Sequence, residues 1–599
     1  MNLSPESHTI KSICTNFPPT LDVPIPDTED VIHILYKLIH ISPTIMMPAN
    51  IIEFEYRVKH GLVPEYLLCA IFAAGMKHIK NKRTHSDRVI EALYARRSLE
   101  LIKALNPKND LLALWACVFI IHYCRGNEDQ CSFTQAMILA KSIVLTTKLH
   151  MLDAQKSDKI SYQEIKEKTK FKLCTQGIKE RQEFKRRIWW LYYITTISEY
   201  YLDSSISTFE DSDIKVNFPE NDFVYRYGGN SAICPEITQK LNNIAENPKY
   251  PVKPQDNYSL VIKMHVFLKS LIDFVSKRWK ENYFDQDQAN LKLVKLIKGL
   301  GDIKFVIESK YSETIYPISS IKEHFSDNFK LSENTDSIIF SYYLRHFHKD
   351  MVIYLYQSEL VRDNSLKLHP GRVKSAKTIC LKCATDQVEM LSWALGRNFV
   401  DTKVFMVIPF TFNAIATLIN MFFIGNETIS TKYTNQYTEI INVYKALSPL
   451  CDLVLIQLKV SENLLELKRE ANHINKPLKY LNSKMLPFSI SPDFEDVDPW
   501  IVPLHGSFYN YKCCYIEIYS EMEINKYLEI PALKRTTRDA EHGKNEFESS
   551  KKYKKDEPEY TCQDTSLCDT KSRNKCDSSP KDSGMKLASI LNCKSKTES

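Results

Sequence analysis

"KRRIWWLYYITTISEYYL" spans residues 185–202 and decides the fold of this chain. Read as a helix, it carries Trp189, Tyr193 and Tyr200 on one side and Trp190 on another, with isoleucines between them. A helix that is apolar on nearly every face is buried between neighbouring elements, so we predict a core helix here. Its indole N–H and tyrosine hydroxyl groups then need partners, which suits the wall of an interior pocket as well as ordinary packing.

Helical periodicity extends in both directions from this segment. Apolar residues recur at helical spacing from about residue 28 to about residue 485, as in the runs that begin at Pro64, Asp110 and Tyr437. Only 14 of the 599 residues are glycine, roughly a third of the usual frequency of about 7%. Folds built on phosphate-binding loops use more glycine, so the composition also favours helices. We therefore predict an all-α fold.

The composition divides the chain into four parts. Residues 1–27 are predicted to form an extended lead-in, and residues 28–490 one large all-helical domain. Residues 491–530 are predicted to form a linker with a short ordered segment. Residues 531–599 are rich in Lys, Asp, Glu, Ser and Thr, which predicts a disordered charged tail.

Charge and hydropathy bear on the location of the chain. The formal net charge is +6, which is too small for this length to give a broad nucleic-acid-binding surface. The first residues lack the basic and apolar regions of a signal peptide, so we expect an intracellular chain whose 16 cysteines are mostly thiols. The apolar stretch 406–425 is long enough to span a membrane. Because Pro409, Asn413 and Asn420 interrupt it, we predict a buried core helix and no membrane partner.

Catalytic and metal-binding signatures are absent from the sequence, which has no G-x-S-x-G, no H-E-x-x-H and no phosphate-binding loop. We predict that the chain is not an enzyme and holds no cofactor. The one C-x-x-C pair, Cys380 and Cys383, has no second pair near it, so we predict buried helix cysteines rather than a zinc site. His346 and His348 cannot share a helix face, and we predict a surface pair rather than a metal site.

A basic cluster lies in the predicted tail, and it consists of Lys551, Lys552, Lys554 and Lys555. Such a cluster can be a nuclear import signal. It can equally be a solvated charge run, because acidic residues follow it directly.

Nine residues in and after the core helix follow a spaced pattern: Arg186, Arg187, Trp189, Trp190, Asp211, Asp213, Ile214, Val216 and Pro219. The pattern resembles the signature of the fungal-specific transcription factor domain, the middle homology region of zinc-cluster regulators. That family typically shows Arg-Arg-x-Trp-Trp, an aromatic helix, a Gly-Arg-Pro turn and then Asp-x-Asp-Ile-x-Val-x-x-Pro. The turn is missing here, since Ser204, Ser205 and Ile206 stand in its place. Similarity to the family's other helices extends from about residue 28 to about residue 470.

The resemblance implies a nuclear regulator of RNA polymerase II transcription, with an all-helical regulatory domain. Its implied partners are transcription co-regulators, promoter DNA and a second subunit in a homodimer or heterodimer. Family members read DNA through an amino-terminal module of six cysteines that holds zinc. Cys14 is the only cysteine before Cys69, so we expect that module, and with it zinc, to be missing from this chain. DNA contact is then expected to be indirect, in a regulatory-domain-only paralogue or a truncated gene product.

Two further interpretations stay open. The chain can be an intracellular helical interaction scaffold without direct DNA binding, which the missing cysteine module and the missing turn favour. If it senses an effector, we expect Trp189, Trp190, Tyr193 and Tyr200 in the pocket wall, with one arginine of the signature pair near the mouth. The alternative is that all six residues, Arg186 and Arg187 included, are structural.

Overall fold

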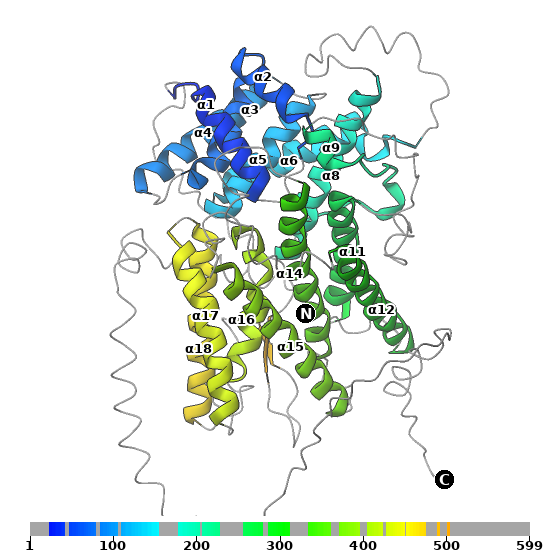
Figure 1. The fold of residues 1–599 in the computed structure, drawn as a ribbon, viewed down its shortest axis with the longest axis vertical. Coiled ribbons are helices and arrows are strands. Elements are labelled where there is room, and N and C mark those ends of the chain that lie inside the picture. Colours follow the sequence, from blue (N-terminus) through cyan, green and yellow to red (C-terminus); the bar gives the residue numbers. More distant parts are fainter. Residues whose placement is uncertain are drawn as a thin grey trace, which may run out of the picture. The chain divides into compact units, whose positions relative to one another are not determined.

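Helices account for nearly all of the described chain, which confirms the predicted all-α class (Figure 1). The structure is a computed structural model, and it describes residues 23–41, 47–79, 84–105, 110–127, 129–154, 178–203, 206–227, 256–278, 286–311, 333–360, 370–395, 404–422, 427–449, 451–474, 488–490 and 500–503. These residues belong to one unit, Met1–Cys514. The predicted tail lies outside the described residues, as does most of the predicted lead-in.

The helices of the first half pack around α5. Helices α3, α4, α6 and α8 all contact it, and α1 reaches the group through α3. In chain order these elements are α1 (Thr28–Ile41), α2 (Ile51–Lys59), α3 (Glu65–Gly75), η2 (Met76–His78), α4 (His85–Ala104), α5 (Leu111–Asn127), α6 (Gln130–Thr147), η3 (Leu149–Met151), α8 (Ile178–Leu202), η5 (Asp211–Asp213) and α9 (Asp222–Tyr227).

In the second half α14 takes the central place. Helices α11, α12, α15 and α16 all contact it, and α8 joins the two halves because it contacts both α5 and α11. These elements are α11 (Asn257–Arg278), α12 (Gln286–Lys310), α14 (Glu333–Leu360), α15 (Pro370–Leu395), η7 (Val404–Phe410), α16 (Phe412–Ile419), α17 (Glu427–Leu447) and α18 (Asp452–Ile474).

Short polar side chains begin several of these helices. The carboxylate of Asp27 accepts hydrogen bonds from the first backbone N–H groups of α1, which begins at Thr28 as the sequence predicts. Thr84 and Asp87 form a reciprocal capping box at the start of α4. Asp256 accepts from the backbone N–H groups of Tyr258 and Ser259 at the start of α11. Each cap satisfies donors that lack a partner within the helix.

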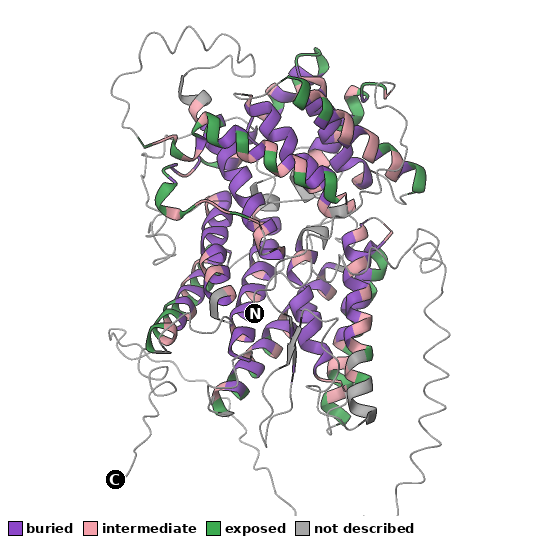
Figure 2. Cartoon of the chain, turned by 180° about the vertical axis from the view of Figure 1, so that it is seen from behind, coloured by how far each residue is buried: buried purple, intermediate pink, exposed green. Residues whose placement is uncertain are grey.

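The core runs along α5 and α8 as well as along α14. Every residue from Ile188 to Ile197 in α8 is buried, as the predicted core helix requires. Figure 2 shows that buried residues form long stretches along the helices, while exposed residues gather on outer faces and at helix ends. A close approach adds to this packing, because a Cβ atom at Gly75 in α3 would lie 2.0 Å from Ile34 Cγ2 of α1.

Within the apolar stretch 406–425, the described residues form two short helices rather than the single helix that the sequence predicted. A 3₁₀ helix, η7, contains Pro409 and is followed by α16. Proline has no backbone N–H and fixes φ, so a continuous α-helix is interrupted there. The predicted burial is correct, since every residue of α16 is buried. None of the described helices combines the length and the apolar character that crossing a bilayer requires.

A small antiparallel strand pair follows the helices. Strand β1 (Phe488–Ile490) pairs with β2 (Ile501–Pro503), with Ser489 opposite Val502. Strand β2 contacts α14 and α16. The residue before it, Trp500, is buried, and the ammonium group of Lys377 in α15 lies over its ring. Residues on both sides of the predicted boundary at 490/491 therefore meet in this pair.

Candidate functional site

Arg187 of α8 is the centre of a buried ionic cluster. Its Nε atom donates to Glu183 Oε1 at 2.7 Å, one helical turn earlier, and its Nη1 atom donates to Asp222 Oδ1 at 2.6 Å. Its Nη2 atom donates to the carbonyl oxygen of Glu220 at 3.0 Å, and the ring of Tyr225 lies 3.8 Å from the guanidinium carbon. Burial disfavours the charge, but the two carboxylates outweigh it and hold the pKa of Arg187 above its usual value.

Arg186 makes a second set of contacts beside the first. Its Nε and Nη2 atoms donate to the two carboxylate oxygens of Asp153 at 3.0 and 2.9 Å. The same carboxylate accepts from the backbone N–H of Asn217 at 2.8 Å. Bidentate arginine–carboxylate pairs are among the strongest and most directional polar contacts in proteins. The pair therefore fixes α8 against the extended segment that follows η5.

Asp222, the first residue of α9, carries the network onward to α11. Its Oδ2 atom accepts from Arg226 Nε at 2.5 Å, and its backbone N–H donates to Asp256 Oδ1 at 3.2 Å. Asp256 in turn caps α11. Tyr225 links α9 to the segment before α2, because its hydroxyl donates to the carbonyl oxygen of Pro48 at 2.8 Å. We call the group of Asp153, Glu183, Arg186, Arg187, Asp222 and Arg226 the arginine clasp.

The arginine clasp has the properties of a structural element. All six side chains are buried, and each cation faces at least one carboxylate. Buried charges are tolerated only when they are paired and hydrogen-bonded, and removing one partner is costly. Glu183 and Arg187 stand four residues apart, a spacing that places them on one face of a helix. The sequence gave no signal for Asp153 or Asp222, which lie 33 and 35 residues from their arginines.

The two tryptophans of the signature differ in their polar contacts. The Trp190 indole donates to the carbonyl oxygen of Asn217 at 2.8 Å, and its ring stacks on Phe218. Trp189 packs edge-on against Phe209, and its indole N–H has no hydrogen-bond partner among the residues that the structure describes. The hydroxyl of Tyr193 is likewise buried and without a partner in the described chain. Two polar atoms of the predicted pocket wall are thus free to meet a small molecule or water.

Tyr200 lies farther along α8 and belongs to a different cluster. Its hydroxyl donates to Asp273 Oδ1 at 3.2 Å, and Asp273 pairs with the buried Lys269, which also pairs with Asp211. The 13 residues between Arg187 and Tyr200 correspond to about 20 Å along a helix. One small ligand could therefore touch only part of the predicted set. The four tail lysines 551, 552, 554 and 555 lie outside the described residues.

The prediction of a surface histidine pair is wrong. His346 and His348 of α14 are both buried, because neighbouring helices cover this helix on several sides. His348 Nε2 lies 3.0 Å from the carbonyl oxygen of Leu300, and burial lowers the pKa of His348 to about 4. Both histidines are therefore neutral at pH 7. Cys380 and Cys383 are buried in α15, as predicted. Among the described residues, no group of three or more His, Cys, Asp or Glu side chains is placed to hold a metal ion.

Asp350 of α14 is a buried carboxylate without a cation. Its oxygens accept from the Tyr201 hydroxyl at 2.7 Å and from Asn413 Nδ2 at 2.9 Å, and it forms no ion pair with any described residue. Burial raises the pKa of Asp350 to about 7, although the two hydrogen bonds oppose the shift. This group joins α8, α14 and α16 by hydrogen bonds alone.

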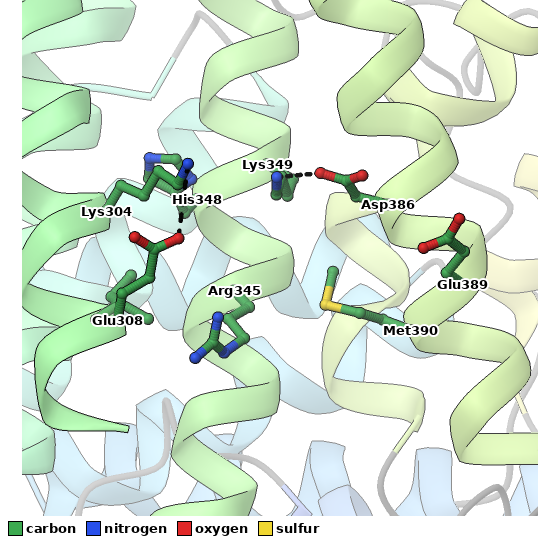
Figure 3. Close-up of a pocket in the computed structure, with 9 residues that line it drawn as sticks. Lys304, Glu308, Arg345, His348, Lys349, Asp386, Glu389 and Met390 are labelled. Atoms are coloured by element: carbon green, nitrogen blue, oxygen red, sulfur yellow. Dashed lines mark hydrogen bonds and ion pairs between the residues drawn. The ribbon is translucent and has the colours of Figure 1, made fainter. Parts of the chain in front are cut away.

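A cavity of about 170 Å³ lies between α12, α14 and α15, and the sequence gave no signal for it (Figure 3). Each helix contributes three residues at i, i+3 and i+4. The lining residues are Lys304, Ile307 and Glu308 of α12, Arg345, His348 and Lys349 of α14, and Asp386, Glu389 and Met390 of α15. We call it the charged cavity. None of the six residues of the predicted effector pocket lines it.

Two ion pairs connect residues of the charged cavity. Lys349 pairs with Asp386, and Lys304 pairs with Glu308 at 3.6 Å (Figure 3). Both members of the second pair are about half exposed. Arg345 donates through Nε to Ser341 Oγ at 3.2 Å. The cavity therefore combines partly exposed charges of both signs.

No protein-family model, curated protein or solved structure matches this chain. The resemblance to the fungal regulator family accordingly rests on the residues of the α8 block and of the helices around it.

Proposed function

We propose that this chain is the regulatory domain of a fungal transcription regulator of the zinc-cluster family, acting on RNA polymerase II transcription in the nucleus. One observation carries most weight. The first half of the signature is bonded to the segment that carries the second half, because Trp190 donates to the backbone carbonyl oxygen of Asn217, between Val216 and Pro219, and Arg187 donates to Asp222, three residues after Pro219. A family pattern whose two segments are joined in space is more telling than a match in composition.

DNA reading is assigned in this proposal to a partner or to a zinc-cluster segment outside this sequence. The helical body then serves co-regulators and a dimer partner. No catalytic role is proposed. An effector is assigned to the middle of α8, and the buried indole N–H of Trp189 and the hydroxyl of Tyr193 support this, since neither has a partner in the described chain.

The proposal is tested by tethering the full chain to an unrelated DNA-binding domain in a fungal host and measuring a reporter gene. A several-fold change in reporter transcription, up or down, is expected relative to the DNA-binding domain alone. Arg469→Ala on the outside of α18 serves as a matched control for Arg187→Ala in the arginine clasp. Only the clasp variant should abolish the effect. An inert fusion that is folded and expressed would reject the regulatory function and favour the interaction scaffold.

Localisation is tested separately with a fluorescent fusion of the full chain. We expect nuclear fluorescence that is lost when Lys551, Lys552, Lys554 and Lys555 are changed to alanine together. The matched control changes four other tail lysines to alanine, namely Lys581, Lys586, Lys594 and Lys596. If both variants behave alike, the basic cluster is only a solvated charge run.

A further inference from the structure

An uncovered line of apolar residues runs along the outer side of α6. Ile138 and Leu145 are 64% and 49% exposed, and Cys131 is exposed as well. The three residues stand seven positions apart, which is almost two helical turns, so they lie in one line along the helix. Single exposed apolar residues are normal on protein surfaces, but a regular line of them is typical of helices that associate. We call these three residues the α6 ridge.

The rest of α6 is occupied by contacts within the chain. Helices α4 and α5 pack against its inner side. The polar side chains that flank the ridge are engaged too, because Gln135 accepts from Lys103 Nζ at 2.7 Å and Lys141 donates to Ser207 Oγ at 2.7 Å. Gln135 and Lys141 stand three residues before and three residues after Ile138, so they lie on opposite flanks. The fold therefore fixes both borders of the ridge and leaves the ridge itself open to solvent.

Charges of opposite sign stand at the two ends of the ridge. Asp129 caps the first turn of α6, and the exposed Lys148 directly follows its last residue. Ile138 lies almost midway between them, nine residues after Asp129 and ten before Lys148. The helix dipole also has opposite signs at the two ends. A helix with this symmetric spacing of apolar residues and opposite end charges is complementary to a second copy of itself that runs in the opposite direction.

We propose that the α6 ridge is the contact between two copies of this chain, which meet antiparallel about a two-fold axis at Ile138. A two-fold axis that brings residue i to residue j of the partner also brings j to i. Ile138 then meets the partner's Ile138, and Cys131 meets the partner's Leu145. Asp129 approaches the partner's Lys148 at both ends of the contact. A parallel arrangement would place like charges opposite each other at both ends, which is unfavourable.

The size of the ridge sets the strength of this contact. The 18 residues of α6 span about 27 Å, and a strip about 10 Å wide along them covers roughly 270 Å². Standard interfaces bury about 800 Å² on each partner, so we expect a reversible dimer that forms only at micromolar or higher concentration. The regulatory use of this dimer rests on the proposed function. The contact itself is measured on the purified chain, so either can fail without the other.

The first test measures the mass of the purified full chain by analytical ultracentrifugation, from low micromolar concentration to about 100 μM. We expect a monomer that becomes a dimer as the concentration rises. Ile138→Glu should raise the dissociation constant at least about tenfold, because it places two carboxylates at the two-fold axis. Leu291→Glu makes the same kind of change at a residue of α12 that is 59% exposed, and it should leave the dimer unchanged.

Circular dichroism of each variant shows that it is folded. A chain that stays monomeric over the whole range would leave the ridge to a different partner and overturn the proposal. A dimer that the Ile138 and Leu291 variants affect equally would place the contact elsewhere and overturn it as well.

The second test determines the direction of the two helices. Leu145→Cys adds a thiol that the antiparallel contact brings beside the partner's Cys131, so a short bis-maleimide should join two chains in higher yield than in the native protein, whose other cysteines give the background. Adding Cys131→Ser to this variant should return the yield to that background, and Leu291→Cys should not exceed it. A product that survives Cys131→Ser would indicate parallel helices and overturn the proposal, as would a Leu145→Cys yield no higher than background.

Discussion

The arginine clasp and the charged cavity both bring cations and carboxylates together, but they differ in access to water. In the clasp, Arg187 is 0% exposed and Glu183 is 2% exposed, and every charge faces a partner. In the charged cavity, Lys304 and Glu308 are 54% and 51% exposed, and their nitrogen and oxygen atoms are 3.6 Å apart. Water screens the second pair and has no access to the first.

This difference separates charges that the fold fixes from charges that can exchange partners. A buried charge that loses its partner cannot be rehydrated without disrupting the fold, so the clasp tolerates no exchange of partners. A half-exposed charge exchanges partners, water included, at little cost. The aromatic middle of α8 and Asp350 lie between these extremes, and substitutions in all four places test the comparison.

The largest effect is expected for Arg187→Ala. The substitution leaves the carboxylates of Glu183 and Asp222 buried without their guanidinium partner, and it should lower the free energy of unfolding by about 3–5 kcal/mol. Urea unfolding followed by circular dichroism measures it. The matched control, Arg469→Ala, removes an exposed partner of Glu466 on α18 and should cost less than about 1 kcal/mol. Equal costs would contradict a structural clasp.

The next effect concerns Asp350 and depends on pH. Because its pKa rises from the ordinary value of 3.8 to about 7 on folding, the folded state holds the proton more tightly than the unfolded chain does. The stability that this group contributes is therefore present at acidic pH and is lost as pH rises toward about 7. The Asp350→Asn variant does not undergo this loss. Between pH 5 and pH 8 its free energy of unfolding should therefore rise by roughly 2–4 kcal/mol relative to that of the native chain.

Urea unfolding of both proteins at these two pH values measures the change. Asp287→Asn on the exposed side of α12 is the control, and it should follow the native chain at both values. If the free energies of unfolding of the Asp350 variant and the native chain change equally between the two pH values, this carboxylate is already ionised in the folded state at pH 5.

A smaller effect distinguishes the adjacent tryptophans. Trp189→Phe and Trp190→Phe remove rings of the same size from equally buried positions, but only Trp190 donates to a described carbonyl oxygen. The Trp190 variant should therefore be less stable than the Trp189 variant by about 1 kcal/mol, the net value of one hydrogen bond. Chemical unfolding of both variants measures the difference. A reversed order would show that the Trp189 N–H has a stabilising partner of its own.

The smallest effect is expected for Lys349→Met at the charged cavity. The substitution breaks the pair with Asp386, whose side chain is partly exposed, so the free energy of unfolding should fall by less than about 1 kcal/mol. The same urea titration measures it. A loss comparable with that of Arg187→Ala would show that the cavity charges are structural.

The sequence predicted what depends on local spacing. Helix periodicity and scarce glycine indicated the all-α fold, and the spaced apolar residues from about residue 28 indicated where its helical domain begins. The burial of Trp189 and Trp190 followed from a helix with no polar face. These features depend on neighbours within one or two turns, which a single sequence displays directly.

The sequence did not predict what depends on how distant helices meet. His346 and His348 were expected at the surface because their spacing excludes one shared face, yet neighbours cover α14 on several sides and bury both. The charged cavity combines residues from three helices, and Lys304 and Met390 lie far apart along the chain. Pairing of Arg186 with Asp153 likewise requires the fold to be known first.

The contact between Tyr225 and Pro48 sets an order of events during synthesis. The hydroxyl and its acceptor are 177 residues apart, and Asn50, which caps α2, also donates to the Tyr225 carbonyl oxygen. At about 5–20 residues per second, a ribosome needs roughly 9–35 s to make the chain between them. Throughout that interval α2 has no α9 to dock on. In the nascent chain, α2 therefore lacks its contacts with α9 until a segment that is translated much later has been made.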